Sequence, residues 1–421
     1  MTESLFPGVF ARRVRGVELS PIAAAGARAA RLAAEGRSIV VLTSGEPDFD
    51  TPQAIKDAAA LALAQGQTKY TPTAGTAALR RAVADDYRQR HGLPTESANV
   101  IISNGGKQVI YLALAATLDE GDEVIVPTPY WPTFLDSVRV NGGTPVLAPT
   151  APADGFKLTP QGLRQALTPR TKWLILNSPG NPSGAVYSEA ELAALAAVLR
   201  EHPSVLVLWD EMYEQIWFDE APTHLLRAAP DLAGRTLAVN GVSKAYAMTG
   251  WRIGWGVGPA ALIGVLEAVQ SQVSSGPSSL GQAAALVALQ GVADDFVENA
   301  RLAYARRARV IVDGLGAVPG LSVTAPRGSF FAWIGVAGLI GQVRPDGAVI
   351  ADDGDVIADD GDVADWLLEA EGVAVVRGAA YGLSPYLRLS FAASDAKVAE
   401  AVARIARAVA ALRPAALEAA A

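Results

Sequence analysis

The chain has 421 residues, of which 50% are hydrophobic and 19% are charged, with a net charge of −8 and no cysteine. This length is too great for one ordinary core, so it predicts two domains in a globular chain. The lack of cysteine excludes disulfides, thiolate metal sites and cysteine nucleophiles. The acidic balance argues against nucleic acid or an anionic membrane as a partner. No apolar run is long enough to span a bilayer and the N-terminus does not read as a signal peptide, so a cytoplasmic protein is the default expectation.

Short apolar runs alternate with alanine-rich stretches through the first part of the chain. We expect strands at 100–102, 123–126, 144–147, 173–176, 205–208 and 236–239, and helices at 106–117, 129–141, 160–168 and 188–201. Strands without polar alternation, separated by helices, are typical of a parallel sheet that is covered on both faces.

The later part of the chain has a different pattern. Residues 262–315 are mostly helical, and after them we expect strands at 322–324, 330–334, 373–376 and 386–391 and a final helix at 394–412. This order predicts a smaller α+β domain. The predicted division is an N-terminal segment that packs with the small domain (1–55), a large cofactor-binding domain (56–300) and a small C-terminal domain (301–421).

A local repeat occurs between the expected strands at 330–334 and 373–376. Residues 349–355 read VIADDGD, and residues 356–362 repeat the same seven letters. The carboxylates could bind calcium, but their spacing does not fit the EF-hand pattern. We therefore expect a solvated surface insertion here.

The strongest chemical signal lies between Asn240 and Gly254, where a predicted strand ends just before Ser243-Lys244. A lysine in apolar surroundings is partly desolvated, which disfavours the ammonium form and leaves an amine that can form an imine with an aldehyde cofactor. Arg252 and the Ser243 hydroxyl suit a phosphate dianion. A surface lysine in a loop is the alternative, and the flanking glycines and tryptophan argue against it.

Polar residues follow other predicted strands. The loop 177–184 is rich in proline and glycine and can present Asn181 at the carboxyl edge of the sheet. Asp210 closes an apolar strand, where a carboxylate is costly unless it is paired. A pyridinium nitrogen would be a suitable partner, and a helix cap is the alternative. Gly105-Gly106 open a helix whose N-terminus attracts phosphate, whereas no G-x-G-x-x-G follows a strand to support a dinucleotide site.

Together these motifs resemble the class I, fold-type-I aminotransferases, which depend on pyridoxal 5'-phosphate (PLP). The similarity runs from Arg12 to about Ile405 and includes GEPDFDTP (45–52), TKYTPTAG (68–75), NGGKQ (104–108), GDEVIVPTPYW (121–131), NSPGNPSG (177–184), DEMYE (210–214), SKAYAMTGWRIG (243–254) and LRLSFA (387–392). Within the class, the chain is most similar to the aspartate/prephenate aminotransferase subgroup, which has a lysine directly after the glycine pair, as Lys107 is here. The resemblance implies an α/β fold, with a mostly parallel seven-stranded sheet between helices in the large domain and a smaller α+β domain.

The resemblance also implies the residues that would bind the cofactor. Lys244 would hold PLP as a Schiff base and then move a proton, with Asp210 on the pyridinium nitrogen and Tyr213 on the ring oxygen. Asn181 would share the contact with the ring oxygen. The phosphate would be bound by Gly106, Lys107, Ser243, Arg252 and, from a neighbouring subunit, Tyr70, and the ring face would be covered by Tyr130 or Trp131. The active sites would thus be shared across a homodimer.

For the substrate, the resemblance implies that Arg388 clamps the α-carboxylate with help from the Gly45 backbone, while Trp131, Asn181 and Lys107 provide further contacts. The expected reaction is amino-group transfer between an L-amino acid and a 2-oxo acid by a ping-pong cycle, with aspartate or glutamate and 2-oxoglutarate or oxaloacetate as candidates.

The sequence differs from the subgroup at two positions, and these differences allow other substrates as alternatives. Glu18 stands where the subgroup has lysine, and Ile22 where it has threonine. Lys107 favours a distal carboxylate and Glu18 opposes one, so a neutral or cationic amino acid is an alternative. Another PLP reaction, by a lyase or a biosynthetic cyclase, is also open. A transcription regulator would need a basic DNA-binding domain, and no residues are left to build one.

Overall fold

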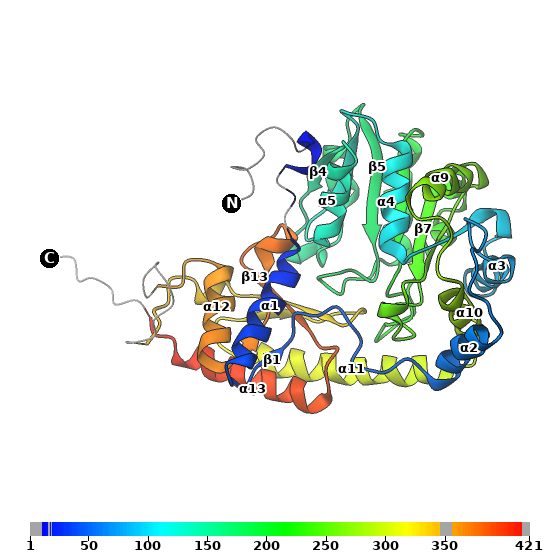
Figure 1. Ribbon diagram of the computed structural model, residues 1–421. Coiled ribbons are helices and arrows are strands. Elements are labelled where there is room, and N and C mark those ends of the chain that lie inside the picture. The colour runs from blue at the N-terminus through cyan, green and yellow to red at the C-terminus, as the bar shows by residue number, and fades with distance from the viewer. Residues whose placement is uncertain (1–10, 16, 18, 346–355, 415–421) are drawn as a thin grey trace.

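The computed structural model describes residues 11–15, 17, 19–345 and 356–414 (Figure 1). Its large sheet has seven strands in the order β2-β8-β7-β6-β5-β3-β4. These strands are β2 (Val100–Ser103), β8 (Gly254–Val257), β7 (Thr236–Gly241), β6 (Leu206–Asp210), β5 (Thr171–Asn177), β3 (Glu123–Pro127) and β4 (Thr144–Ala148). All are parallel except β8, which runs antiparallel to β2 and β7. The predicted fold class and the six expected strands are confirmed, but the expected strands did not include β8.

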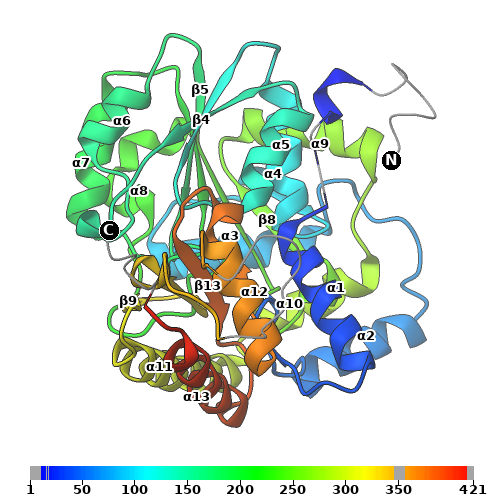
Figure 2. The same ribbon diagram turned by 90° about the vertical axis from the view of Figure 1, so that its left-hand side faces the viewer.

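Helices cover both faces of this sheet (Figures 1 and 2). On β5, Trp173 and Ile175 pack in one core, while Leu174 and Leu176 pack in the other, because successive strand residues point to opposite faces. The first core includes residues of α4 (Gly106–Thr117), α5 (Pro132–Val140) and α9 (Ala260–Val273). The second includes residues of α3 (Ala77–His91), α6 (Pro160–Ala166), α7 (Glu189–Arg200), α8 (Leu225–Ala228) and α10 (Ser279–Ala288).

The small domain has an antiparallel sheet in the order β12-β13-β10-β9. Its strands are β9 (Ser322–Thr324), β10 (Phe331–Gly335), β12 (Val376–Arg377) and β13 (Tyr386–Ser390), and its helices are α11 (Asp294–Gly316), α12 (Asp360–Glu371) and α13 (Asp395–Ala411). One hydrophobic core joins these elements except β12, whose Val376 packs in a smaller cluster with Trp333 and Tyr381. Short 3-10 turns complete the chain at Arg12–Val14, Ser97–Asn99, Pro152–Asp154, Pro230–Arg235, Thr249–Trp251, Ala337–Leu339 and Gly378–Tyr381.

The N-terminal segment contacts the small domain along α1 (Pro21–Ala34) and β1 (Val40–Val41), whereas α2 (Gln53–Ala64) packs on α10 of the large domain. Strand β1 pairs in parallel with β11 (Val373–Ala374), and Arg28 of α1 bonds to Glu369 of α12 at 2.9 Å. The exact domain divisions stay a prediction, since α11 runs without a break through the proposed boundary at residue 300.

The expected solvated insertion is wrong for the second VIADDGD copy. Ile357 is fully buried and Asp360 is 1% exposed, because this copy enters the small domain and begins α12 there. The first copy, 349–355, lies outside the described residues. Val356, the first residue of the second copy, forms an isolated β-bridge with Val343. Within the ranges that the structure describes, no helix is both long and apolar enough to cross a bilayer.

Gly254 provides a test of the contact between β8 and the start of α4. A Cβ at Gly254 would lie 2.3 Å from the Gly106 nitrogen, so Gly254→Ala must push two backbones apart. We expect the free energy of unfolding, measured with urea, to fall by about 1–3 kcal/mol. Gly264 of α9 is the control, because its added Cβ meets nothing within 4 Å. Gly264→Ala should be neutral or stabilise the helix by up to about 1 kcal/mol. Equal stability of the two variants would contradict the packing constraint.

Candidate active site

A cavity of about 530 Å³ lies where the carboxyl ends of β5, β6 and β7 meet the small domain. Parallel strands bring their carboxyl ends to one edge of the sheet, which is where open α/β folds bind ligands. The cavity is lined by all of the predicted site residues except Tyr70 and Tyr130, namely Gly45, Gly106, Lys107, Trp131, Asn181, Asp210, Tyr213, Ser243, Lys244, Arg252 and Arg388.

Lys244 lies just beyond the end of β7 and points into the cavity. Its Nζ donates a hydrogen bond to the Gly45 carbonyl oxygen at 2.6 Å. Burial lowers the pKa of Lys244 to about 8, and the charges of Arg252 and Arg388 act in the same direction. Much more of this amine is therefore neutral, and able to act as a nucleophile, than at an ordinary lysine.

Asp210, the last residue of β6, is 5% exposed. The Met212 N–H donates to its Oδ1 at 3.1 Å, and no ion pair involves this carboxylate among the residues that the structure describes. Burial raises the pKa of Asp210 to about 7, against the opposing effects of the Met212 N–H and Lys244. A buried carboxylate in this state fits a ligand that carries a cationic nitrogen, as PLP does.

Cationic and polar groups gather at the start of α4. The helix follows Gly105, whose φ of 87° strains any other residue, and a Cβ there would displace Arg252, since it would lie 2.4 Å from Nη2. Arg252 donates to the Thr249 carbonyl at 2.9 Å, and burial together with Arg252 lowers the pKa of Lys107. These cations, the helix N-terminus and the nearby Ser243 hydroxyl suit a phosphate dianion.

Arg388 of β13 is 1% exposed. Its Nη2 donates to the Thr43 carbonyl at 2.5 Å and its Nη1 to Asn181 Oδ1 at 3.2 Å, while the guanidinium lies 4.3 Å from the centre of the Phe331 ring. Burial lowers the pKa of Arg388. No carboxylate in the described part of the chain forms an ion pair with it. Since a buried cation without a counter-ion is costly, the site fits a carboxylate ligand.

Tyr213 and Trp131 form other parts of the cavity wall. The Tyr213 ring packs edge-on against Phe330 and Phe331, with centroid distances of 5.3 and 5.7 Å. Burial raises the pKa of Tyr213, so its hydroxyl stays protonated and can donate a hydrogen bond. The ring of Trp131 lies 4.9 Å from Lys107 Nζ.

Two predicted residues do not line the cavity. Tyr130 packs instead against Gly382 of the small domain, and its N–H donates to the Tyr381 carbonyl at 3.0 Å. Of the two residues expected over the ring, Trp131 is therefore the one at the cavity. Tyr70 has 97% of its surface exposed, so within one chain it does not reach the site.

Of the two residues that depart from the subgroup, the structure places one. Ile22 of α1 lines the cavity, whereas Glu18 lies outside the described residues. Glu46 also lines the cavity and was not predicted. Its carboxylate accepts a hydrogen bond from the Thr249 hydroxyl and raises the pKa of Lys244 against the effect of burial. The signal was its place in the GEPDFDTP motif, directly after Gly45.

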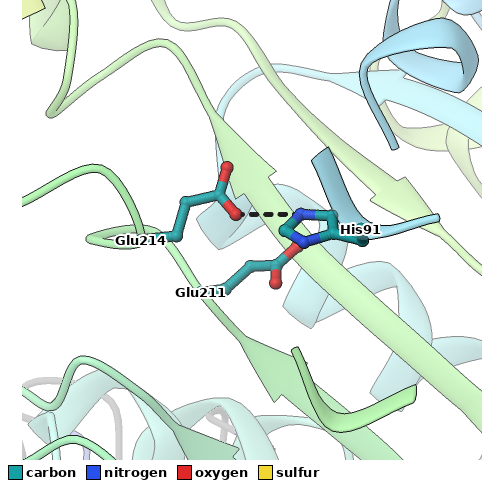
Figure 3. A group of neighbouring side chains, drawn as sticks. All are labelled: His91, Glu211 and Glu214. Atoms are coloured by element: carbon teal, nitrogen blue, oxygen red, sulfur yellow. Dashed lines mark ion pairs between the residues drawn. The ribbon is translucent and has the colours of Figure 1, made fainter. Parts of the chain in front are cut away.

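A buried polar cluster behind Asp210 was also missed. Figure 3 shows His91 of α3 pointing toward Glu211 and Glu214. His91 Nε2 lies 3.1 Å from Glu214 Oε2, and Glu211 accepts hydrogen bonds from Tyr87 and, at 2.9 Å, from Trp209. Burial opposes ionisation of Glu214, but the contact with His91 and the charges of His91 and Arg90 together outweigh it and lower the pKa.

The geometry of this cluster resembles a metal site, since its three candidate ligand atoms lie within 4.8 Å of one another. The same atoms already interact with one another and with Tyr87 and Trp209. The cluster thus anchors the 210–214 turn to α3 on the side opposite the cavity. The sequence signal was the pair of glutamates in DEMYE, directly after the apolar run that ends at Trp209.

Comparisons with known proteins agree with this geometry. The family model for aminotransferases of class I and II matches residues 37–405. The chain is 46% identical to an aspartate aminotransferase of Rhizobium meliloti (strain 1021), over 94% of this chain and 95% of the relative. It is 47% identical to an aspartate/prephenate aminotransferase of Cereibacter sphaeroides, over 90% and 93%.

Solved structures give the same result. The crystal structure of the Rhizobium meliloti aspartate aminotransferase is 45% identical and has a TM-score of 0.91, with 96% of this chain and 99% of that chain covered. The Thermus thermophilus aspartate aminotransferase, solved with maleate, is 40% identical with a TM-score of 0.87, and the coverage is 95% and 99%.

The lowered pKa of Lys244 can be measured by acetylation of the protein without ligands. Half of the Lys244 amine should be neutral near pH 8, whereas an amine with the usual pKa of about 10.4 is less than about 1% neutral there. Acetylation of the Lys244 peptide, followed by mass spectrometry, should reach half of its maximal rate near pH 8. Exposed Lys397 provides the reference peptide in the same digest. A midpoint for Lys244 near pH 10 would show that burial does not shift this amine.

Proposed function

The chain belongs to the aminotransferase class I and II family and is an aminotransferase, and from this we propose that it uses PLP to move an amino group between an acidic L-amino acid and a 2-oxo acid. One observation carries the proposal: a single cavity brings together the Lys244 amine, the buried Asp210 carboxylate and the buried Arg388 guanidinium. A ping-pong cycle in the cytoplasm is part of the same proposal.

Different residues of the cavity would bind different parts of the cofactor. When bound, PLP supplies an aldehyde that captures amines and a ring that withdraws electrons. Asp210 would hold the proton on the ring nitrogen, and Tyr213 and Asn181 would donate hydrogen bonds to the ring oxygen. The α4 N-terminus, Lys107, Ser243 and Arg252 would hold the phosphate.

Proton transfer and substrate orientation would fall to Lys244 and Arg388. Lys244, with its lowered pKa, can accept a proton from the substrate Cα and return one. Arg388 would bind the α-carboxylate through two parallel hydrogen bonds, and its contacts with Asn181 and Thr43 fix the plane of the guanidinium. Gly45 accepts a hydrogen bond from Lys244 and thereby joins the N-terminal segment to the reacting amine.

Lys107 supports aspartate or glutamate, with oxaloacetate or 2-oxoglutarate, as substrates. Its amine lies beside Trp131 on the cavity wall, where it could reach a distal carboxylate as well as the phosphate. The names of the relatives cited above point to aspartate. Ile22 lines the same cavity and favours an apolar side chain, so a neutral amino acid is the competing substrate.

A panel of amino acids tests this proposal. Holoenzyme should convert aspartate and glutamate faster than alanine, phenylalanine or lysine, as measured by formation of the 2-oxo acid and by transfer of the amino group. Lys107→Ala should reduce kcat/KM for the two acidic substrates about tenfold more than for alanine, because a hydrogen bond to a charged group contributes about 1.5–3 kcal/mol.

Exposed Lys397→Ala is the control and should change neither class of substrate. If Lys107→Ala lowers kcat/KM equally for all substrates, Lys107 contacts only the cofactor phosphate and not a distal carboxylate. Release of free ammonia in place of amino-group transfer would instead favour the lyase alternative.

Arg388→Lys tests the α-carboxylate site. An ammonium group cannot reproduce a planar pair of hydrogen bonds, so every amino acid should lose about 2–4 kcal/mol of transition-state stabilisation, whatever its side chain. Arg377→Lys is the matched control, because Arg377 lies on the neighbouring strand but is exposed. If the loss of transition-state stabilisation depends on the substrate side chain, Arg388 does not bind the α-carboxylate.

We also propose a homodimer in which Tyr70 completes the phosphate site of the other subunit. The segment around Tyr70 is fixed, since Thr71 accepts a hydrogen bond from Gln282 at 3.0 Å, yet the Tyr70 ring is almost fully exposed. On α2, Leu61 and Leu63 are also exposed, by 58% and 56%. An ordered apolar surface of this kind favours a partner chain, and a two-fold dimer gives both sites the same contacts.

Complementation between two inactive variants tests this arrangement. Lys244→Ala and Tyr70→Ala subunits are mixed under conditions that allow exchange. In a mixed dimer one site collects both lesions and the other neither, and about half of randomly paired dimers are mixed, so roughly a quarter of wild-type activity should return. Activity no greater than the sum of the two variants, with exchange confirmed, would place Tyr70 within its own site or away from it.

A further inference from the structure

Asp360, the first residue of α12, is a buried carboxylate on which three hydrogen bonds converge. Its Oδ2 accepts from the Ser384 hydroxyl at 2.7 Å, the Ala379 N–H at 3.1 Å and the Tyr386 N–H at 3.2 Å. No arginine, lysine or histidine in the described ranges forms an ion pair with it. All of these contacts go to one short segment, residues 378–386, which connects β12 to β13.

This segment reaches the candidate active site at two points. Its Tyr381 lies against Arg388, with 5.1 Å between the guanidinium carbon and the ring centre, and the Tyr381 carbonyl accepts the N–H of Tyr130 at 3.0 Å. Tyr386 begins β13, the strand that carries Arg388 two residues later. Displacement of the segment would therefore move the guanidinium and also Tyr130, the residue directly before Trp131 of the cavity wall.

Tyr381 and Leu383 pack in a hydrophobic cluster with Trp333, and Asp360 adds a directional polar constraint to this packing. A carboxylate oxygen that binds two backbone N–H groups and one hydroxyl sets the relative positions of residues 379, 384 and 386 at once. Because the carboxylate is buried, water cannot easily replace it when it is removed.

We propose that Asp360 is a positioning residue for the substrate-carboxylate site, acting through the 378–386 segment on Arg388 and, by way of Tyr130, on Trp131. The proposal rests on the proposed function of Arg388 as the α-carboxylate ligand. It also gives a role to the second VIADDGD copy, which supplies the buried Asp360 next to the exposed Asp359.

The test compares D360A, D360N and D359A holoenzymes. D360A removes the acceptor, D360N keeps an acceptor oxygen in the same shape, and D359A removes the N-cap of α12, whose side chain accepts from Gly361 and Asp362. The first readout is the dissociation constant of maleate, used as a dicarboxylate probe. The second is amide hydrogen exchange in residues 378–388, and the third is PLP content by absorbance.

D360A should weaken maleate binding and raise KM for every amino acid by about tenfold or more, since misplacement of a binding group by about 1 Å is enough for such losses. It should also speed exchange in 378–388 and leave PLP content close to that of the wild type, because Lys244, Asp210 and the predicted phosphate ligands lie outside that segment. D360N should restore most of the affinity. D359A should lower the melting temperature without changing maleate affinity.

Maleate affinity in D360A equal to that in D359A would overturn the proposal, as would failure of D360N to restore the affinity. If D360A does not fold, S384A removes one of the three donors and should shift both readouts in the same direction by a smaller amount. Wild-type protein that neither binds maleate nor transfers amino groups would instead refute the proposed function. Exchange in 378–388 would still show whether Asp360 fixes the segment.

Discussion

The burial of three separated charges around one cavity is the constraint on which the site depends. Lys244, Asp210 and Arg388 all face this space, and none forms an ion pair with another in the described structure. A protein that only had to be stable would neutralise such groups or exclude them. Under the proposed function, a ligand with a cationic ring nitrogen, an electrophile and a carboxylate would compensate these shifted pKa values and charges.

The fold brings these charges together from distant parts of the sequence. The large sheet delivers Asp210 and Lys244 at the carboxyl ends of neighbouring parallel strands, β6 and β7. Arg388 comes from the small domain, where β13 lies between β10 and β12. Thr43 and Gly45 of the N-terminal segment bond to Arg388 and Lys244, so this segment joins the two halves of the site.

Other buried acids act as anchors and not as reagents. Glu211 and Glu214 hold the turn of Asp210 and Tyr213 against α3, with His91 as the counter-ion (Figure 3). Asp360 collects donors from one connecting segment of the small domain. In each case the carboxylate has several partners within the protein, whereas the Asp210 carboxylate accepts only the Met212 N–H among the described residues.

The sequence by itself determined the fold class, six of the seven large-sheet strands and the place of Lys244, Asp210 and Asn181, because strand ends and glycine-rich turns are local patterns. It missed β8, where two glycines in four residues hide the apolar pattern. Only the tertiary structure decided that Trp131 and not Tyr130 faces the cavity, that Asp360 is buried in place of being solvated, and that Glu211 and Glu214 meet His91. These outcomes depend on contacts between residues far apart in the chain, and the local sequence around each of them is compatible with either arrangement.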